Sequence, residues 1–467
     1  MRKIKTIAAL LLLSAFGTTA LAQGNISKEM LEKIQASQSH TPADKALFNA
    51  IANNNIDDLA RSANSKAAID RSFSIETPKQ NIHNQLSSGR CWMFSSMNAA
   101  RADFAHANGD SIVVEFSHDY LFFWDQLEKA NLMLQGVINT AGKSIEDPDV
   151  QFFFKSPIND GGTFCGFADL ALKYGVVPMS AQPETYSSEN TSRMSRLIAS
   201  KLREYGLELR KMVVDKAKAK AIEARKTEML STVYHMLSLT LGEPVKEFNY
   251  AFRNKSGKVV IPEQTYSPQE FYQKTIGRDL SQENIMVMND PRRPYHQTFE
   301  VEYDRHTYDG HNWKYLNLPC EEIAQLAIAQ LKDGRKMYSS YDVGKQSDRK
   351  KGVADVDTYD YASLFSTDFP MNKADRIATF DSGSTHAMTL TAVDLDANGK
   401  PTKWKVENSW GAASGVEGYM IMTNKWWEEY MFRLVVDKKY VPENLLKEYD
   451  QKPTILSYDD PLFGEDD

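Results

Sequence analysis

Apolar side chains at helical spacing mark the middle of the chain. From residue 187 to 247 they recur at steps of three and four, which places them on one face of an α-helix. Basic residues then alternate with alanine at 216–226, and a second apolar run covers 229–241. The pattern predicts a helical insertion whose basic face is solvated, with a subunit interface as the alternative. The first helix has its apolar positions at Met194, Leu197, Ile198, Leu202, Tyr205, Leu209, Met212 and Val213.

The two sides of this insertion have different patterns. Residues 92–107 are good helix formers, and Asn108-Gly109 supplies a stop signal. The polar stretch 25–75 is also expected to be mostly helical. After residue 248, strands and helices are mixed, and the last third is rich in strands. Strands are expected at 259–261, 285–288, 299–303, 336–341, 384–393 and 404–411, and a helix at 321–332.

One short stretch, residues 84–95, carries the chemistry. Cys91 would sit at the start of the 92–107 helix, where unpaired N–H groups and the helix dipole favour an anion. A thiol placed there loses its proton more easily, and the thiolate is the nucleophile. Gln85 lies one loop upstream and could direct its amide at the oxygen that becomes negative during attack on a carbonyl. The stretch therefore predicts an activated nucleophile with half of an oxyanion hole.

Such a nucleophile needs a base, and the base needs an orienting group. His386 lies near the start of one expected strand, and Asn408 lies at the end of the next, in the string Asn-Ser-Trp-Gly. Taken singly, the cysteine would be a buried hydrophobe, the histidine a core residue, the asparagine a turn residue and Gln85 an ordinary surface residue. Their ordered conjunction favours catalysis.

The strings around these residues resemble the bleomycin hydrolase/aminopeptidase C branch of the papain-like cysteine peptidases. They are Asn-Gln-x-Ser-Ser-Gly-Arg-Cys-Trp at 84–92, Thr-His-Ala-Met-Thr at 385–389 and Lys-Trp-Lys-Val-Glu-Asn-Ser-Trp-Gly at 403–411. The resemblance runs from about residue 77 to the C-terminus. It implies an α+β fold with a papain-like two-lobed core, a helical lobe plus a β-barrel-like lobe, with a helical insertion and an N-terminal arm.

The resemblance also implies several substrate contacts, and together with the residue patterns it gives a division of the chain. Gly161 and Gly162 would bind extended peptide backbone, and Trp410 would shield the bond between Asn408 and the imidazole. Relatives assemble as hexamers, so a homohexamer is expected. The expected segments are a signal peptide at 1–22, an arm at 23–80, a helical catalytic lobe at 81–186, an insertion at 187–330 and a β-rich lobe at 331–467 whose C-terminal tail lies in the cleft.

These roles predict a cysteine aminopeptidase. His386 takes the Cys91 proton, the thiolate attacks, and water releases the acyl-enzyme. By resemblance a carboxylate of the C-terminal tail, either the main-chain carboxylate of Asp467 or a side chain, meets the free α-ammonium of the substrate, so the expected partners are peptides with a free N-terminus. The acidic tail is otherwise a solvated end. The alternatives are an oligopeptidase or endopeptidase with a disordered tail, and an inactive peptide-binding scaffold.

The first residues predict export. Arg2, Lys3 and Lys5 precede an apolar stretch too short to span a bilayer, and an Ala-x-Ala site ends at residue 22. The mature protein is expected to be periplasmic or secreted, with no membrane association after cleavage. The formal net charge of the whole chain is −7, which argues against nucleic acid as a partner.

The remaining candidates are thiols and one metal-like motif. Cys165 and Cys320 would either pair or stay free while Cys91 stays free, and Cys165 is either a redox-active neighbour of Cys91 or a buried thiol. Residues 394–399 match the start of a calcium loop, but Lys405 stands where a glutamate is required. That segment is interpreted as a hairpin turn. No metal and no cofactor are expected.

Overall fold

The structure is a computed structural model that describes residues 24–65 and 70–463. The predicted signal segment at 1–22 and the terminal Asp467 lie outside the described residues. The chain divides into two compact units, residues 1–60 and residues 61–467. No helix in the described part of the chain is both long enough and apolar enough to cross a membrane.

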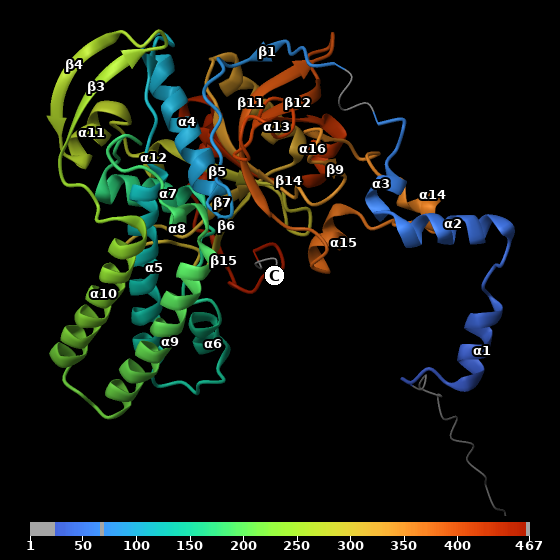
Figure 1. The fold of residues 1–467 in the computed structure, drawn as a ribbon, viewed down its shortest axis with the longest axis horizontal. Helices are drawn as coiled ribbons and strands as arrows, with labels where there is room; N and C mark the ends of the chain where they lie inside the picture. Colours follow the sequence, from blue (N-terminus) through green and yellow to red (C-terminus); the bar gives the residue numbers. More distant parts are fainter. Residues whose placement is uncertain (1–23, 66–69, 464–467) are drawn as a thin grey trace, which may run out of the picture. The chain divides into compact units, whose positions relative to one another are not determined.

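Helices dominate the first half of the chain (Figure 1). The first unit contains α1 (Lys28–Ala36), α2 (Pro42–Asn53) and α3 (Ile56–Ala60). The second unit contains α4 (Cys91–Ala107), α5 (His118–Asn139), α6 (Pro148–Lys155), α7 (Phe164–Tyr174), α8 (Tyr186–Glu189), α9 (Ser192–Val214), α10 (Ala219–Leu241), α11 (Pro268–Thr275), α12 (Leu280–Glu283), α13 (Cys320–Lys332), α14 (Tyr361–Phe365), α15 (Lys373–Ala378), α16 (Asn424–Tyr430), the 3-10 turn η1 (Lys438–Tyr440) and α17 (Glu443–Tyr449).

Strands of the second unit form two sheets. The larger sheet has the order β15-β6-β7-β5-β14-β8-β11-β12-β13-β10-β9, with β1 paired to β11, and the smaller has the order β2-β3-β4. The strands are β1 (Ile75–Glu76), β2 (Ile112–Val113), β3 (Phe248–Asn254), β4 (Val259–Tyr266), β5 (Asn284–Met288), β6 (Gln297–Val301), β7 (Lys314–Asn317), β8 (Met337–Tyr341), β9 (Ser347–Asp348), β10 (Val353–Ala354), β11 (His386–Leu395), β12 (Pro401–Glu407), β13 (Tyr419–Thr423), β14 (Met431–Asp437) and β15 (Thr454–Leu456).

The expectation of a mostly helical segment from 25 to 75 is wrong in its second half. The helices of the first unit end at Ala60, and the described residues between there and 75 contain none. The chain instead joins the sheet: Ile75 of β1 lies opposite Val393 of β11, and the Thr77 N–H donates to the Thr391 carbonyl at 3.0 Å. Pairing with an existing strand satisfies these backbone groups, a tertiary effect that local composition does not reveal.

Helix α4 confirms the expected helix and begins one residue before it. Its last residue is Ala107, Asn108 is the C-cap, and Gly109 continues with φ +64°. Only a residue that tolerates the left-handed region fits this stop well. Nearly all of α4 is buried, so it forms the centre of the helical lobe and not a surface element.

The helices expected between residues 187 and 247 are confirmed as a pair of long helices. α9 and α10 pack against each other and against α5, and the three run side by side in Figure 1. The apolar face of α9 is buried at Met194, Ile198, Leu202, Tyr205 and Leu209. In α10 the buried positions fall at every fourth residue, on one face: Met229, Val233, Leu237 and Leu241.

The strands around the expected base and orienting residue form as predicted. β11 and β12 are antiparallel neighbours, with Thr389 opposite Glu407. The calcium-like motif runs from the end of β11 into the turn, where the carboxylate of Asp396 accepts backbone N–H groups of Asn398 and Lys400 at 2.8 and 2.9 Å. Gly399 has φ +76°. The hairpin interpretation is confirmed.

Two hydrophobic clusters fill the second unit. One is built on α4, α5, α7, α9 and α10 and includes the fully buried Trp92. The other lies between α13, α16 and the strands β8, β11, β12 and β14, and includes Trp404 and Trp427, whose rings stack 4.8 Å apart. The fold is therefore α+β, with a helical lobe and a β-rich lobe. The two lobes meet where α4 packs against β11 and β8.

Candidate active site

Packing of α4 on β11 brings the expected nucleophile to the expected base. Cys91 is the first residue of α4 and His386 the first residue of β11. The N–H of Ala387 donates to the Cys91 sulfur at 3.4 Å, and the hydroxyl of Thr389 donates to the Ser95 carbonyl at 3.1 Å, one turn further along. Cys91 as a whole residue is partly exposed.

The imidazole of His386 is held by the predicted orienting residue. Its Nε2 lies 2.8 Å from Oδ1 of Asn408, and the same oxygen accepts the N–H of Ser409 at 2.7 Å. Because that oxygen accepts both bonds, Nε2 carries a proton and Nδ1 keeps its lone pair. Trp410 stacks on the imidazole with ring centres 4.7 Å apart. The arrangement leaves one ring nitrogen free to act as a base.

Gln85 is fixed between the two strings that the sequence singled out. Its Oε1 accepts the hydroxyl of Ser409 at 2.5 Å, its Nε2 donates to the Ser88 carbonyl at 2.5 Å, and its own N–H donates to the Ser409 carbonyl at 2.8 Å. An amide nitrogen has two hydrogens, so one remains for a developing oxyanion. The side chain is buried, which makes this donor pre-organised.

Burial disfavours the charged form of Cys91 and of His386 when each group is considered separately. It raises the pKa of the Cys91 thiol to about 11, against the expectation drawn from the helix start, and it lowers the pKa of His386 to about 4. Both shifts have the same cause, since a charged form loses hydration in a protein interior. A proton that moves from sulfur to imidazole would create both charges side by side, where each compensates the other.

The glycine pair at 161–162 forms a tightly supported loop beside the nucleophile. The indole N–H of Trp92 donates to the Asp160 carbonyl at 2.9 Å. A Cβ on Gly162 would lie only 2.1 Å from the ring of His306, whereas one on Gly161 would meet nothing closer than 3.8 Å. Gly162 therefore needs to be glycine for packing, whereas Gly161 has open space around its Cα.

The residues that hold this loop were not found in the sequence. Lys129 donates to the carbonyls of Gly161 at 2.6 Å and Asn159 at 3.0 Å, and it pairs with Asp125 at 3.1 Å. Asp125 also binds Nδ1 of His306 at 2.5 Å. The four-residue spacing of Asp125 and Lys129 on one helix was a usable signal. His306 is 181 positions from Asp125 in sequence, and nothing local marks it.

A buried ion network lies directly behind Asn408. The preceding residue, Glu407, binds Lys336 at 2.6 Å and Arg101 at 2.8 Å. Burial alone would raise the pKa of Glu407, but these two cations hold it below its ordinary value. The network connects α4, β8 and β12 and thus fixes the strand that positions Asn408.

The C-terminal segment is described as far as Phe463. Leu462 is 2% exposed, and a Cβ on Gly383, three residues before His386, would lie 3.9 Å from the Leu462 carbonyl oxygen. The Phe463 ring lies 5.5 Å from the guanidinium carbon of Arg433. The expected contact of Asp467 lies outside the described residues.

The three cysteines are free, which is the unbridged alternative. Cys165 lies in α7 within the helical cluster, whereas Cys320 begins α13 beside the other cluster. Cys165 is 1% exposed, burial raises its pKa far above the ordinary range, and its sulfur lies 3.0 Å from the Thr163 hydroxyl. These features fit the buried thiol and not the redox-active neighbour.

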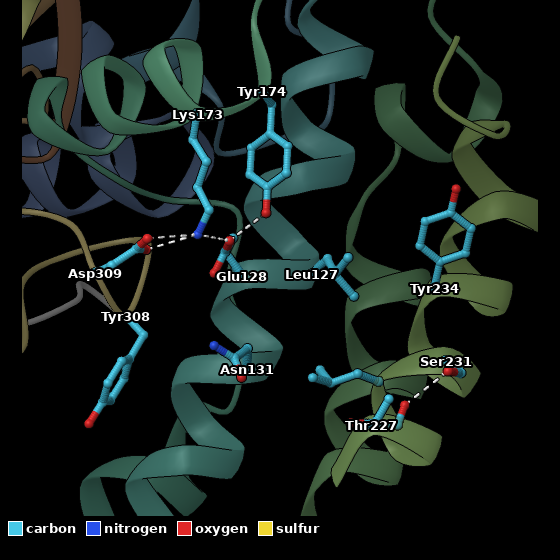
Figure 2. Close-up of a pocket in the computed structure, with 11 residues that line it drawn as sticks. Leu127, Glu128, Asn131, Lys173, Tyr174, Thr227, Ser231, Tyr234, Tyr308 and Asp309 are labelled. Atoms are coloured by element: carbon cyan, nitrogen blue, oxygen red, sulfur yellow. Dashed lines mark hydrogen bonds and ion pairs between the residues drawn. The ribbon is translucent and has the colours of Figure 1, made fainter. Parts of the chain in front are cut away.

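A separate cavity of about 620 Å³ lies between α5, α7, α10 and the 308–309 loop (Figure 2). Lys173 bridges Glu128 and Asp309, at 2.8 Å each, and Tyr174 donates to Glu128 at 2.5 Å. None of the expected catalytic residues lines it. Its charges pair with each other, so it offers no nucleophile or base for hydrolysis.

Comparison with known proteins agrees with the geometry. The model of the Peptidase C1-like family matches residues 25–463. Aminopeptidase C of Lactobacillus delbrueckii subsp. lactis is 38% identical over 431 residues, 91% of this chain and 94% of the relative. Aminopeptidase C of Streptococcus thermophilus is 35% identical over 444 residues, 94% and 98% of the two chains.

A solved structure gives the same result for the fold. The crystal structure of PepW from Lactobacillus rhamnosis HN001 superposes with a TM-score of 0.88 at 38% identity, over 94% of this chain and 99% of that one. This chain therefore belongs to the Peptidase C1-like family and is a papain-like cysteine aminopeptidase.

Proposed function

We propose that the enzyme removes N-terminal residues from peptides through a thiolate–imidazolium pair formed by Cys91 and His386, in the manner of bleomycin hydrolase. The observation that carries the proposal is the imidazole fixed by Asn408 at 2.8 Å at the start of β11, with the Cys91 sulfur 3.4 Å from the next residue's N–H. The assigned proton on Nε2 leaves Nδ1 as the acceptor of the thiol proton.

Each step follows from this arrangement. The sulfur forms a bond to the scissile carbonyl carbon, and the carbonyl oxygen gains the electron pair beside Gln85 and the Cys91 N–H. The intermediate collapses, the C–N bond breaks, and His386 gives its proton to the leaving amine. Water then adds to the thioester, the C–S bond breaks, and the thiol is restored.

The restriction to free N-termini would come from the C-terminal segment. Asp460 lies between two arginines, Arg292 at 2.7 Å and Arg293, and two residues later the Leu462 carbonyl lies near Gly383. A carboxylate at the end of this segment, such as Asp467, would attract the α-ammonium and block longer acyl-side substrates. The anchored course of residues 460–463 supports this role.

Assembly and location complete the proposal. The enzyme forms a homohexamer and is exported to the periplasm or beyond after cleavage at residue 22. The proposal of a hexamer rests on the family strings around Cys91 and His386, and the proposal of export rests on the residue pattern of the leader. Light scattering of the purified protein and N-terminal sequencing of the exported form test them; a monomer, or an uncleaved cytoplasmic chain, would contradict them.

Two peptides, one free and one N-acetylated, test the peptidase proposal. We expect the wild type to cleave only the free peptide, and a variant lacking Asp466 and Asp467 to gain cleavage of the acetylated one. Equal cleavage of both peptides by both proteins would indicate an endopeptidase with an irrelevant tail. No cleavage by correctly folded protein would indicate a peptide-binding scaffold.

A further inference from the structure

Arg349 lies over the ring of Trp410, the side chain that stacks on the imidazole of His386. Its guanidinium carbon is 5.8 Å from the centre of the Trp410 ring, and that ring stacks on His386 at 4.7 Å. Arg349 is exposed, in the turn between β9 and β10. Its charge contributes, after burial, to the lowered pKa of His386, so the two groups interact electrostatically. A cation therefore stands at the rim of the site next to the base.

The ion pairs formed within residues 24–65 and 70–463 do not include Arg349. Among the described residues no carboxylate lies within ion-pair distance of Arg349, whose Nε donates weakly to the Val343 carbonyl at 3.4 Å. Asp342, on the same loop, is already engaged by the Ser382 hydroxyl at 2.6 Å and the Gly344 N–H at 3.2 Å. The next residue, Lys350, is also exposed. Two exposed basic residues therefore stand next to each other in this turn.

The reaction fixes which part of a substrate passes this rim. His386 protonates the leaving amine, so the residues that follow the scissile bond begin at the imidazole and continue past Trp410. The proposed function assigns the acyl side to the C-terminal segment, in which the Leu462 carbonyl lies near Gly383. An extended chain advances about 3.3–3.6 Å per residue, so the two distances to the Trp410 ring place the guanidinium at most about three residues along the chain from the imidazole.

We propose that Arg349 is a specificity-determining residue that binds a carboxylate two or three residues after the scissile bond, and above all the C-terminal carboxylate of a tri- or tetrapeptide. A guanidinium matches a carboxylate with two parallel hydrogen bonds, and an exposed one is available without breaking another pair. The inference rests on the proposed direction of cleavage. It makes the enzyme a peptidase for the short end products of other peptidases.

The test compares kcat/KM for Ala-Gly-Gly with that for its C-terminal amide. The ratio within one variant cancels any general effect on the catalytic groups, including the effect of Arg349 on His386. For an exposed pair we expect the free acid to be favoured about two- to fivefold in the wild type. The preference should disappear in Arg349→Gln, survive in part in Arg349→Lys, and weaken at high salt.

Lys350→Gln is the matched control, because it removes a neighbouring exposed charge. It should keep the wild-type ratio. The amide of Ala-Gly-Glu distinguishes a C-terminal carboxylate from a side-chain carboxylate. If its kcat/KM exceeds that of Ala-Gly-Gly amide in the wild type but not in Arg349→Gln, Arg349 also binds side-chain carboxylates. An unchanged ratio in Arg349→Gln, or an equal loss in Lys350→Gln, would overturn the proposal. Failure of the proposed function would show separately, as cleavage of N-acetylated forms by the wild type.

Discussion

Neutralising one carboxylate should release the restriction to free N-termini. Asp460 accepts hydrogen bonds from Arg292 at 2.7 Å and from Arg293, and both arginines also bind Asp290. Burial alone would raise the pKa of Asp460, but the arginines hold it below its ordinary value, so it is ionised at neutral pH. Asp460→Asn keeps the shape of the side chain and removes the charge.

The magnitude follows from these contacts. A hydrogen bond to a charged group contributes about 1.5–3 kcal/mol, and the Asp460 side chain is only 11% exposed, so solvent screens it little. In the variant, the asparagine still accepts a hydrogen bond, and Asp290 still neutralises the arginines. We therefore expect the docking of the C-terminal segment to lose about 2 kcal/mol. This loss shifts the equilibrium between the docked and the released segment roughly 30-fold toward release.

The assay is kcat/KM on an N-acetylated peptide. We expect it to rise about 30-fold in Asp460→Asn if only the released form cleaves blocked peptides. Asp459→Asn, at the exposed neighbouring position, should match the wild type. Limited proteolysis of the C-terminus reports release independently. A segment that becomes protease-sensitive while blocked peptides stay uncleaved would refute the reasoning.

Three further predictions concern the site and its support. Lys336→Met leaves Glu407 buried with one partner fewer and should lower the free energy of unfolding by about 3–5 kcal/mol in urea titrations; a loss below about 1 kcal/mol would contradict it. Asn408→Ala should lower kcat about 100-fold with little change in KM, because the imidazole loses its orientation. A rise in KM of the same size with kcat unchanged would instead indicate a binding role. His118 stacks on Phe94 at 3.6 Å, and burial holds its pKa well below 6.5. As the pH falls below 6.5, the unfolded chain therefore binds more protons at this residue than the folded chain does. The free energy of unfolding should drop by up to about 2 kcal/mol at pH 5. His118→Gln should flatten that dependence, and an unchanged slope would exclude His118 as its source.

The sequence predicted the elements whose signals are local. Spacing found the insertion helices, and composition with a stop signal found α4. Strand alternation and turn residues found the β11–β12 hairpin. Ordered motifs supplied Cys91, His386 and Asn408 as candidates, and the structure places these residues at one junction between α4 and the sheet.

What the sequence missed depends on contacts between distant segments. The pairing of β1 with β11 overrode a polar, helix-like composition. The support of Gly162 by His306, and of Gly161 by Lys129, joins segments that share no motif. The lowered acidity of Cys91 reflects burial, which outweighs the helix start that the sequence could show.

The rate of alkylation of Cys91 by iodoacetamide, followed against pH by mass spectrometry of the labelled peptide, tests the central claim most directly. A thiolate–imidazolium pair predicts rapid labelling that persists well below pH 7 in the wild type and shifts above pH 9 in His386→Ala, where burial alone sets the thiol pKa. Cys165 is buried and provides an internal unlabelled reference. Labelling that rises only at alkaline pH in both proteins would contradict the account.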